Sequence, residues 1–225
     1  MPSSSLRREF LIALGAAPAL LTASTVMAQV SPAPREGADY TVLNNPQPTD
    51  SPGKIEVLDF FWYGCPHCYS FLPDLEAWHK RQGPDVAYKH LPVAFDASRE
   101  AHSKIFFALQ VLNRVDELHV KVFDAYHQRH LRLLDREEIA DFMASNGIAR
   151  EKWLAAYDSF TVAGLVSRAR LMVQAYAIDG TPTIAIDGRF LTSPSIVQSH
   201  SFGGAITVMD YLVDRVRRER THRRS

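Results

Sequence analysis

Residues 59–68 read Asp59-Phe60-Phe61-Trp62-Tyr63-Gly64-Cys65-Pro66-His67-Cys68, an aromatic run that ends at a glycine and leads to the only two cysteines of the chain. The segment from Lys54 to Tyr63 is rich in β-branched and aromatic residues, which is typical of a central strand buried on both faces. Gly64 then ends the predicted strand. A strand that turns directly into a helix would place Cys65 at the helix N-terminus.

The segment from Pro66 to about Gln82 is predicted to be that helix. Phe71, Leu75 and Trp78 recur at the spacing of one helical face. Pro66 is compatible with the first turn, because the first N–H groups of a helix have no intrahelical partner. Pro73 lies inside the segment and predicts a kink. Gly83-Pro84 ends the helix, and a second strand is expected from Val86 to Val93.

The position of Cys65 predicts its chemistry. Unpaired N–H groups and the positive end of the helix dipole favour an anion at a helix N-terminus, and thiolate is such an anion. Because the thiolate is the nucleophile and leaving group in disulfide exchange, we expect Cys65 to be the reactive sulfur. Cys68, one turn further on, would resolve a mixed disulfide. His67 would add a positive charge or a donor near the Cys65 sulfur, and Pro66 would stiffen the loop.

Other uses of a close cysteine pair fit the sequence less well. No second cysteine pair exists for a zinc site or an iron–sulfur cluster, and Tyr69 stands where covalent haem attachment requires histidine. A disulfide between residues three apart closes too small a loop to stabilise the fold much. We therefore predict a redox-active dithiol with no metal and no cofactor. The remaining histidines are interpreted as surface or core residues: His79, His90, His102, His119, His127, His130 and His200.

Composition argues against a nucleic-acid partner. The 225 residues include 25 basic and 25 acidic side chains, so the formal net charge is zero. The one basic cluster, from Arg215 to Arg224, is interpreted as a solvated helix end and frayed tail in preference to a binding patch, because cations favour a helix C-terminus.

Residues 1–28 are predicted to be an export signal. Arg7 and Arg8 precede an apolar segment from Leu11 to about Ala23, and Val26-Met27-Ala28 supplies small residues for cleavage after Ala28. The paired arginines resemble a twin-arginine signal, although Leu6 stands where that motif usually has Ser or Thr. The general secretory route and an uncleaved membrane anchor are the alternatives. Export would place the cysteines in an oxidising, periplasm-like compartment.

The remaining segments predict a small α/β fold with a helical insertion. Residues 29–53 are proline-rich and are expected to form a linker and extended entry segment, with a short edge strand near residues 39–43. Residues 99–176 are almost wholly helical in pattern, with a cap at Asp135 and a stop at Asn146-Gly147. Strands resume at residues 183–192 around the turn Asp187-Gly188, and a last helix spans about residues 202–218. This order indicates an α/β sheet, formed by residues 54–98 and 177–220, interrupted by an all-helical insertion at residues 99–176, with residues 221–225 as a tail.

The motif Asp59 to Cys68, followed distantly by Gly180-Thr181-Pro182-Thr183, resembles the thioredoxin superfamily, and Cys-Pro-His-Cys resembles its DsbA-type periplasmic thiol:disulfide oxidoreductases. The resemblance implies a thioredoxin fold with a helical insertion between its halves. A low-pKa, strongly oxidising cysteine is a standard property of that group, so the resemblance carries the direction of tuning. It also implies that Thr181-Pro182 is a substrate-binding cis-proline loop and that Asp59 exchanges protons with Cys68.

The resemblance further implies a dithiol oxidase that acts on unfolded exported proteins and is reoxidised by a quinone-linked inner-membrane protein. Asp59 is shorter than the glutamate more usual at its position in this group, and Lys89 or His90 is a candidate positive partner for it. Thr181 also occurs before the cis proline of periplasmic isomerases, so a reductase or isomerase is an alternative, as is a binding or chaperone module with a static disulfide. Residues 29–53 are too short for an isomerase dimerisation domain, and we expect a monomer.

Overall fold

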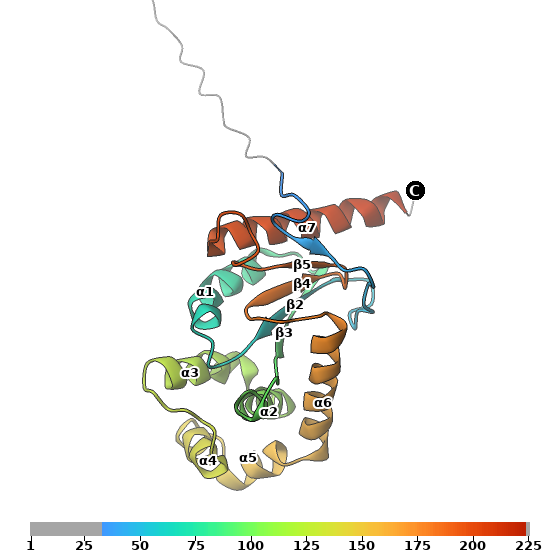
Figure 1. Cartoon of the computed structure of the whole chain (residues 1–225). Coiled ribbons are helices and arrows are strands. Elements are labelled where there is room, and N and C mark those ends of the chain that lie inside the picture. Colours follow the sequence, from blue (N-terminus) through green and yellow to red (C-terminus); the bar gives the residue numbers. More distant parts are fainter. Residues whose placement is uncertain (1–32, 224–225) are drawn as a thin grey trace, which may run out of the picture. The chain divides into compact units, whose positions relative to one another are not determined.

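The computed structural model describes residues 33–223, so the predicted signal at residues 1–28 and the positions 29–32 and 224–225 lie outside the described residues. Five strands form one sheet in the order β1-β5-β4-β2-β3 (Figure 1). The central strand β2 (Ile55–Phe61) pairs in parallel with β3 (Val86–Pro92) and antiparallel with β4 (Thr183–Ile186). The sheet continues through β5 (Phe190–Thr192) to the short edge strand β1 (Thr41–Val42).

All seven residues of β2 are buried, which confirms the predicted central strand. Ile55 and Val57 belong to an apolar cluster with α1 (Pro66–Arg81) and α7 (Phe202–His222) on one face of the sheet. Leu58 and Phe60 belong to a second cluster with the helices on the opposite face. Side chains along a strand alternate between faces, so β2 joins two cores; five of its seven residues are apolar, and the other two are Glu56 and Asp59.

The second face is covered by a block of five helices between β3 and β4 (Figure 1). The block comprises α2 (Ala97–Val111), α3 (Val115–His127), α4 (Arg136–Ser145), α5 (Arg150–Tyr157) and α6 (Phe160–Ala175). The start and end of α4 were both predicted from capping residues in the sequence. The Asp135 carboxylate accepts hydrogen bonds from two N–H groups of the first turn of α4, and Asn146 caps its C-terminus. The predicted α/β class is confirmed.

The last helix differs from the prediction. It continues to His222, past the expected end near Arg218 and into the predicted tail. The basic residues of this helix are more than a solvated end, because Arg217 pairs with Asp85, and Arg220 donates to Asp187 and to the carbonyls of Gly53 and Lys54. These contacts fix α7 to one end of the sheet. No helix between residues 33 and 223 has the length and apolar character needed to cross a membrane.

The turn between β4 and β5 provides a test of this backbone. Asp187 and Gly188 both have positive φ, 54° and 67°, as the predicted two-residue hairpin requires. A Cβ on Gly188 would lie 2.0 Å from the carbonyl oxygen of Gln47. We expect Gly188→Ala to lower the free energy of unfolding by about 2 kcal/mol or more, since strain and a backbone clash combine.

Gly164→Ala is the matched control for that change. Gly164 lies inside α6, and a Cβ there meets nothing within 4 Å. The control should raise the free energy of unfolding by about 0.5–1 kcal/mol, because alanine is the better helix former. Urea unfolding of both variants checks the pair, and equal effects of the two substitutions would contradict the structure of the turn.

Candidate active site

Cys65 is the N-cap residue of α1. Its backbone is extended, and its Sγ accepts a hydrogen bond of 3.3 Å from the backbone N–H of Cys68. Pro66 occupies the first helical position, as predicted, where its missing N–H costs nothing. Gly64 is needed before it, because a Cβ there would lie 2.3 Å from the ring of Trp62. The end of β2 and the start of α1 thus place Cys65 Sγ at the positive end of a helix.

The two cysteines have opposite acid–base properties. The hydrogen bond between their side chains is the largest influence on Cys65 and, with N–H groups of Cys68 and His67, it outweighs burial and lowers the pKa of Cys65 from 9.0 to about 6. Burial raises the pKa of Cys68 well above its usual value, and the charges of Cys65 and Asp59 add to that rise. Both cysteines are free thiols in this structure. At neutral pH Cys65 is a thiolate and Cys68 a thiol.

Cys65 is nearly as buried as Cys68. Only 6% of the residue is exposed, against 4% for Cys68, so substrate attack at Cys65 would take place at a largely covered sulfur. A neighbouring loop contacts this sulfur.

That neighbouring loop is Thr181-Pro182, brought to the cysteines from more than 100 residues along the chain. The peptide bond between these residues is cis, as predicted. Cys65 Sγ lies 3.3 Å from the carbonyl oxygen of Thr181, and the protonated thiol donates a hydrogen bond to that oxygen. The loop precedes β4, which pairs with β2, so sheet pairing holds both sides of the site in register.

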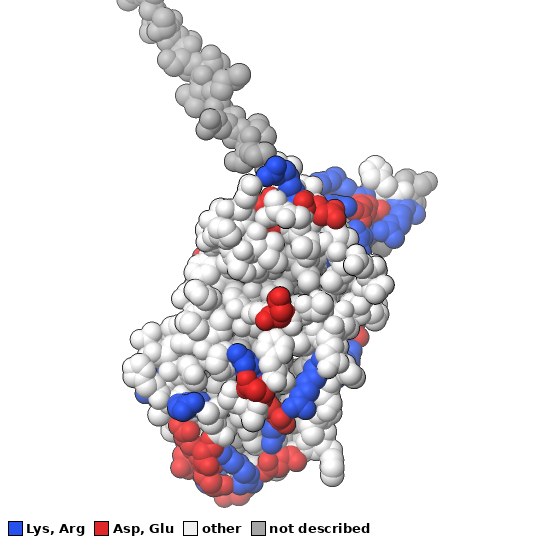
Figure 2. Space-filling view, in the orientation of Figure 1, with Lys and Arg blue, Asp and Glu red and all other residues white. Residues whose placement is uncertain are grey.

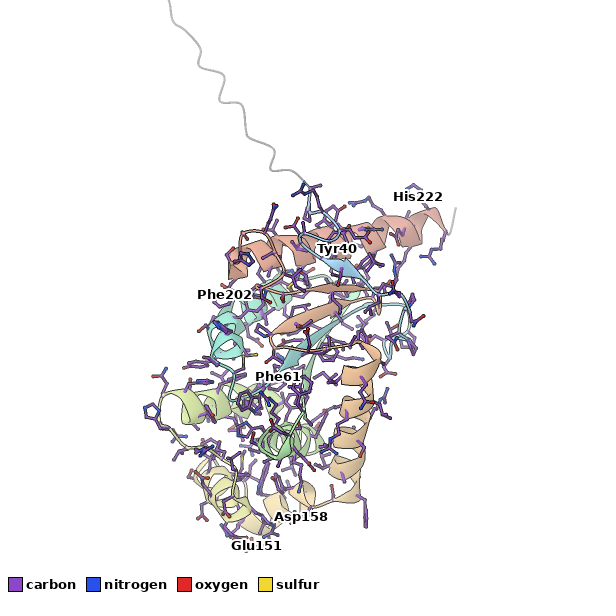
Figure 3. The ribbon with its side chains drawn as sticks, in the orientation of Figure 1. Tyr40, Phe61, Glu151, Asp158, Phe202 and His222 are labelled. Carbon is purple, nitrogen blue, oxygen red and sulfur yellow. The ribbon has the colours of Figure 1, made fainter. Side chains whose placement is uncertain are left out.

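A surface cavity of about 510 Å³ lies beside His67 and the Thr181-Pro182 loop. Its wall includes His67, the Thr181-Pro182 loop, Pro194, His200 and Phe202. Figure 3 shows Phe202 at the start of α7, beside α1. Apart from the two histidines the lining is apolar or neutral, and sequence patterns gave no sign of the contribution from residues 194–202, which follow the last strand.

His67 is exposed on the first turn of α1, and its imidazole belongs to the wall of this cavity. Its backbone N–H is among the groups that lower the pKa of Cys65. The predicted effect of the imidazole charge on Cys65 stays a prediction. In this structure His67 lowers the pKa of Cys65 through its main-chain N–H group.

Asp59 is a buried carboxylate on β2, with 3% of the residue exposed. Its Oδ2 accepts hydrogen bonds from His90 Nδ1 at 3.0 Å and from the hydroxyl of Tyr88 at 3.3 Å. Its Oδ1 has no hydrogen-bond partner among residues 33–223. Of the two candidate positive partners, Lys89 and His90, it is His90 that contacts Asp59.

Lys89 points to the other face of the β3 strand and pairs with Glu56 at 2.6 Å. The alternation of side chains along β3 explains the outcome, because neighbouring residues of a strand face opposite sides. Sequence reasoning missed Tyr88 and also Glu76, whose carboxylate lies 3.7 Å from His90 Nε2. The described part of the chain holds no group of three or more His, Cys, Asp or Glu side chains arranged to bind a metal ion.

Comparison with known proteins gives consistent matches. The DSBA-like thioredoxin domain family matches residues 56–201. The chain is 42% identical over 192 residues to the thiol:disulfide interchange protein DsbA of Burkholderia cepacia, covering 84% of this chain and 90% of that protein. It is 35% identical over 207 residues to DsbA of Pseudomonas aeruginosa, covering 88% of this chain and 96% of that protein.

Solved structures agree with the sequence matches. The crystal structure of Pseudomonas aeruginosa DsbA has a TM-score of 0.78 at 34% identity and covers 82% of this chain and 95% of that one. The oxidoreductase NmDsbA1 from Neisseria meningitidis has a TM-score of 0.73 at 27% identity and covers 83% and 96% of the two chains. These likenesses confirm the predicted thioredoxin fold.

The acidity of Cys65 can be titrated directly. In the reduced protein, the ultraviolet absorbance of the thiolate should rise with a midpoint near pH 6. Cys68→Ala should move that midpoint upward, because the substitution removes the largest stabilising hydrogen bond on the thiolate. Cys65→Ser is the control and should abolish the transition. An unchanged midpoint in Cys68→Ala would contradict the pairing of the two sulfurs.

The same thiolate makes the stability of the reduced protein depend on pH. The pKa of Cys65 is lower in the folded chain than in the unfolded chain, so its contribution is full above about pH 9 and is lost as the pH falls to about 6. Between these values the free energy of unfolding of the reduced protein should rise about 1.4 kcal/mol per pH unit more steeply than that of Cys65→Ser. The free energies of unfolding would be measured by urea unfolding across this pH range, and an equal pH dependence in the two proteins would contradict the prediction.

Proposed function

The chain belongs to the DSBA-like thioredoxin domain family and is a thiol:disulfide oxidoreductase, and on that premise we propose that it donates a Cys65–Cys68 disulfide to newly exported proteins. The observation that carries this proposal is the opposite acidity of the two sulfurs at the start of α1. One sulfur is a good leaving group, and the other holds its proton. The proposal assigns attack by substrate to Cys65 and resolution to Cys68.

The reaction takes two exchange steps. A substrate thiolate attacks Cys65 Sγ, a new intermolecular S–S bond forms, and the Cys65–Cys68 bond breaks with its electron pair on Cys68 Sγ, which takes up a proton. A second substrate thiolate then attacks its partner sulfur in the mixed disulfide, and Cys65 leaves as the thiolate. The substrate loses two electrons and gains a disulfide, and the protein is left reduced.

The low pKa of Cys65 favours this direction. At about pH 7, a pKa of about 6 leaves about nine-tenths of Cys65 as thiolate. Relative to a cysteine that stays protonated, this stabilises the reduced protein by about 1.4 kcal/mol, which makes the disulfide more oxidising by about 30 mV. The N-cap thiolate therefore supports donation of the disulfide over its acceptance.

The substrate in this proposal is an extended, unfolded chain with a free cysteine. It would lie in the cavity of about 510 Å³ beside His67, with its backbone against the loop Thr181-Pro182, whose Thr181 carbonyl contacts Cys65 Sγ. Proline, phenylalanine and neutral polar side chains on the cavity wall suit varied sequences. Figure 2 shows Lys, Arg, Asp and Glu over the C-terminal end of α7, over α4 and α5, and near α2 and α6, while the surface over α1 is largely uncharged. Such a surface does not select a substrate by charge.

Asp59 would serve the buried sulfur. Its charge is among the influences on Cys68, and its Oδ1 has no hydrogen-bond partner among the described residues. A buried carboxylate close to a thiol of raised pKa can accept and return a proton. We assign Asp59 to proton exchange with Cys68 and Pro66 with His67 to tuning of Cys65.

The site of action in this proposal is the periplasm, reached through the predicted twin-arginine-like signal at residues 1–28. Each turnover leaves the protein reduced, so a further oxidant must accept two electrons. A quinone-linked inner-membrane protein would fill that role, and the chain would act as a monomer.

Redox titration against glutathione tests the direction of exchange. We expect a midpoint well above the glutathione poise, that is, a disulfide readily reduced by glutathione. A strongly negative midpoint would instead support a reductase. That alternative is considered because Thr181, which precedes the cis proline, does not distinguish an oxidase from a reductase or isomerase. Failure of the cysteines to exchange at all would support a binding module with a static disulfide.

Trapping variants test the order of attack. With a peptide that carries a disulfide, the reduced Cys68→Ala variant should accumulate a mixed disulfide through Cys65, because the resolving sulfur is missing. Cys65→Ala should accumulate little, since Cys68 is buried and protonated. Mass spectrometry of the adducts reads the result, and preferential trapping on Cys68 would overturn the assignment.

A further inference from the structure

The buried Cys68 sulfur creates a problem that the cysteine motif does not solve. Only 4% of the residue is exposed, and its pKa lies well above the usual value. When the disulfide opens, a proton has to reach this sulfur, and during reoxidation the proton has to leave again. Asp59 can hold the proton for a moment, but it is itself 3% exposed. A further group must connect Asp59 to solvent.

His90 is in position to make that connection. Its Nδ1 lies 3.0 Å from the buried Oδ2 of Asp59, and its Nε2 lies 3.7 Å from Oε1 of Glu76. The side chain of Glu76, on α1, is 37% exposed, against 4% for that of Asp59. One imidazole ring therefore bridges a buried carboxylate and a carboxylate in contact with solvent.

A cavity reaches the same ring from another direction. Its volume is about 390 Å³, and β3, α2 and α6 form its walls. His90 and Tyr88 line it, together with Lys89 and Arg168, whose side chains are 40% and 57% exposed. Neither Asp59 nor either cysteine is among its lining residues. Small solutes that enter this cavity can meet His90 while the cysteines remain covered.

We propose that His90 is a proton-carrying positioning residue, which passes protons between Glu76 and Asp59 and thereby supplies and removes the proton of Cys68. This inference rests on the proposed function for its direction. During donation of the disulfide, His90 Nδ1 gives its proton to Asp59, and Asp59 gives one to the Cys68 thiolate. The neutral ring keeps its Nε2 proton and regains a proton at Nδ1 from solvent or, after a flip of the ring, from Glu76. During reoxidation each transfer runs in reverse, so no proton is gained or lost by the route itself.

The surroundings of His90 keep the ring charged between turnovers. Burial opposes the charge, but hydrogen bonds to Asp59 and Glu76 outweigh burial and raise the pKa of His90 to about 9. The ring of His119 lies beside it, tilted by 37° with ring centroids 4.4 Å apart, and the pKa of His119 is lowered by burial and by the charge of His90. The titratable and charged groups around His90 come from four elements: Asp59 on β2, Tyr88 and Lys89 on β3, Glu76 and His79 on α1, and His119 on α3.

The test uses the oxidised, full-length protein and dithiothreitol as the thiol. Opening of the Cys65–Cys68 disulfide is followed in a single turnover across a range of pH. His90→Gln keeps an N–H for Asp59 but cannot carry a proton, so we expect the rate near neutral pH to fall about ten-fold or more. His79→Gln, an exposed histidine beside Tyr88, is the matched control and should leave the rate unchanged. A His90→Gln protein with the rate and pH profile of the parent would overturn the proposal.

Chemical rescue separates proton transfer from a purely structural role. In His90→Ala, added imidazoles can enter the cavity of about 390 Å³, and the rate should recover by an amount that depends on the pKa of the added imidazole. A loss of rate that no imidazole restores, with an unchanged pH profile, would show that His90 only balances the charge of Asp59 and would overturn the relay. Failure of the parent protein to oxidise dithiol peptides would count against the proposed function alone, since dithiothreitol opens the disulfide in either case.

Discussion

The hydrogen bond from the backbone N–H of Cys68 to Cys65 Sγ is the contact on which the rest of the site depends. It exists because β2 ends at Gly64 and α1 begins at Pro66, so that Cys65 becomes the helix cap. A cap oxygen normally satisfies such an N–H group, and a sulfur anion does so here. The fold thus stabilises the thiolate of Cys65. Because this thiolate exists only in the reduced protein, the reduced form is stabilised relative to the disulfide.

The same construction sets the two cysteines apart. Cys65 gains N–H donors and a sulfur partner, while Cys68, on the first turn of the helix, is enclosed by the core between the sheet and the helical block. Burial disfavours a charge on Cys68 and helix-terminal donors favour one on Cys65, so a single turn of helix separates two acidities. The charge of Asp59 widens the difference by raising the pKa of Cys68 further, and the main-chain N–H of His67 widens it by lowering the pKa of Cys65.

Local rules predicted a large part of this arrangement. The fully buried β2, the cap at Asp135 and the turn at Asp187-Gly188 each follow from residues within one short window. The site residues supplied by distant segments were only partly predictable. Thr181-Pro182 was found through its resemblance to a family, whereas Glu76 and the cavity wall at residues 194–202 carry no pattern of their own. Which of Lys89 and His90 meets Asp59 depends on the register of β3 against β2, a pairing that composition does not specify.

The helices packed on the sheet give the buried carboxylate its properties. Asp59 shares a face of β2 with Val57, the face that α1 covers, and Glu76 of α1 lies beside His90. Without the helices around them, Asp59 and His90 would be solvated, and neither would need the other. With the helices in place, Asp59 keeps one partnered oxygen and one that has no partner among residues 33–223, and His90 lies against a cavity whose rim is charged. A buried charge pair of this kind contributes little net stability compared with an apolar pair of the same size. Its retention in the core, directly behind the resolving cysteine, is therefore better explained by proton movement than by folding.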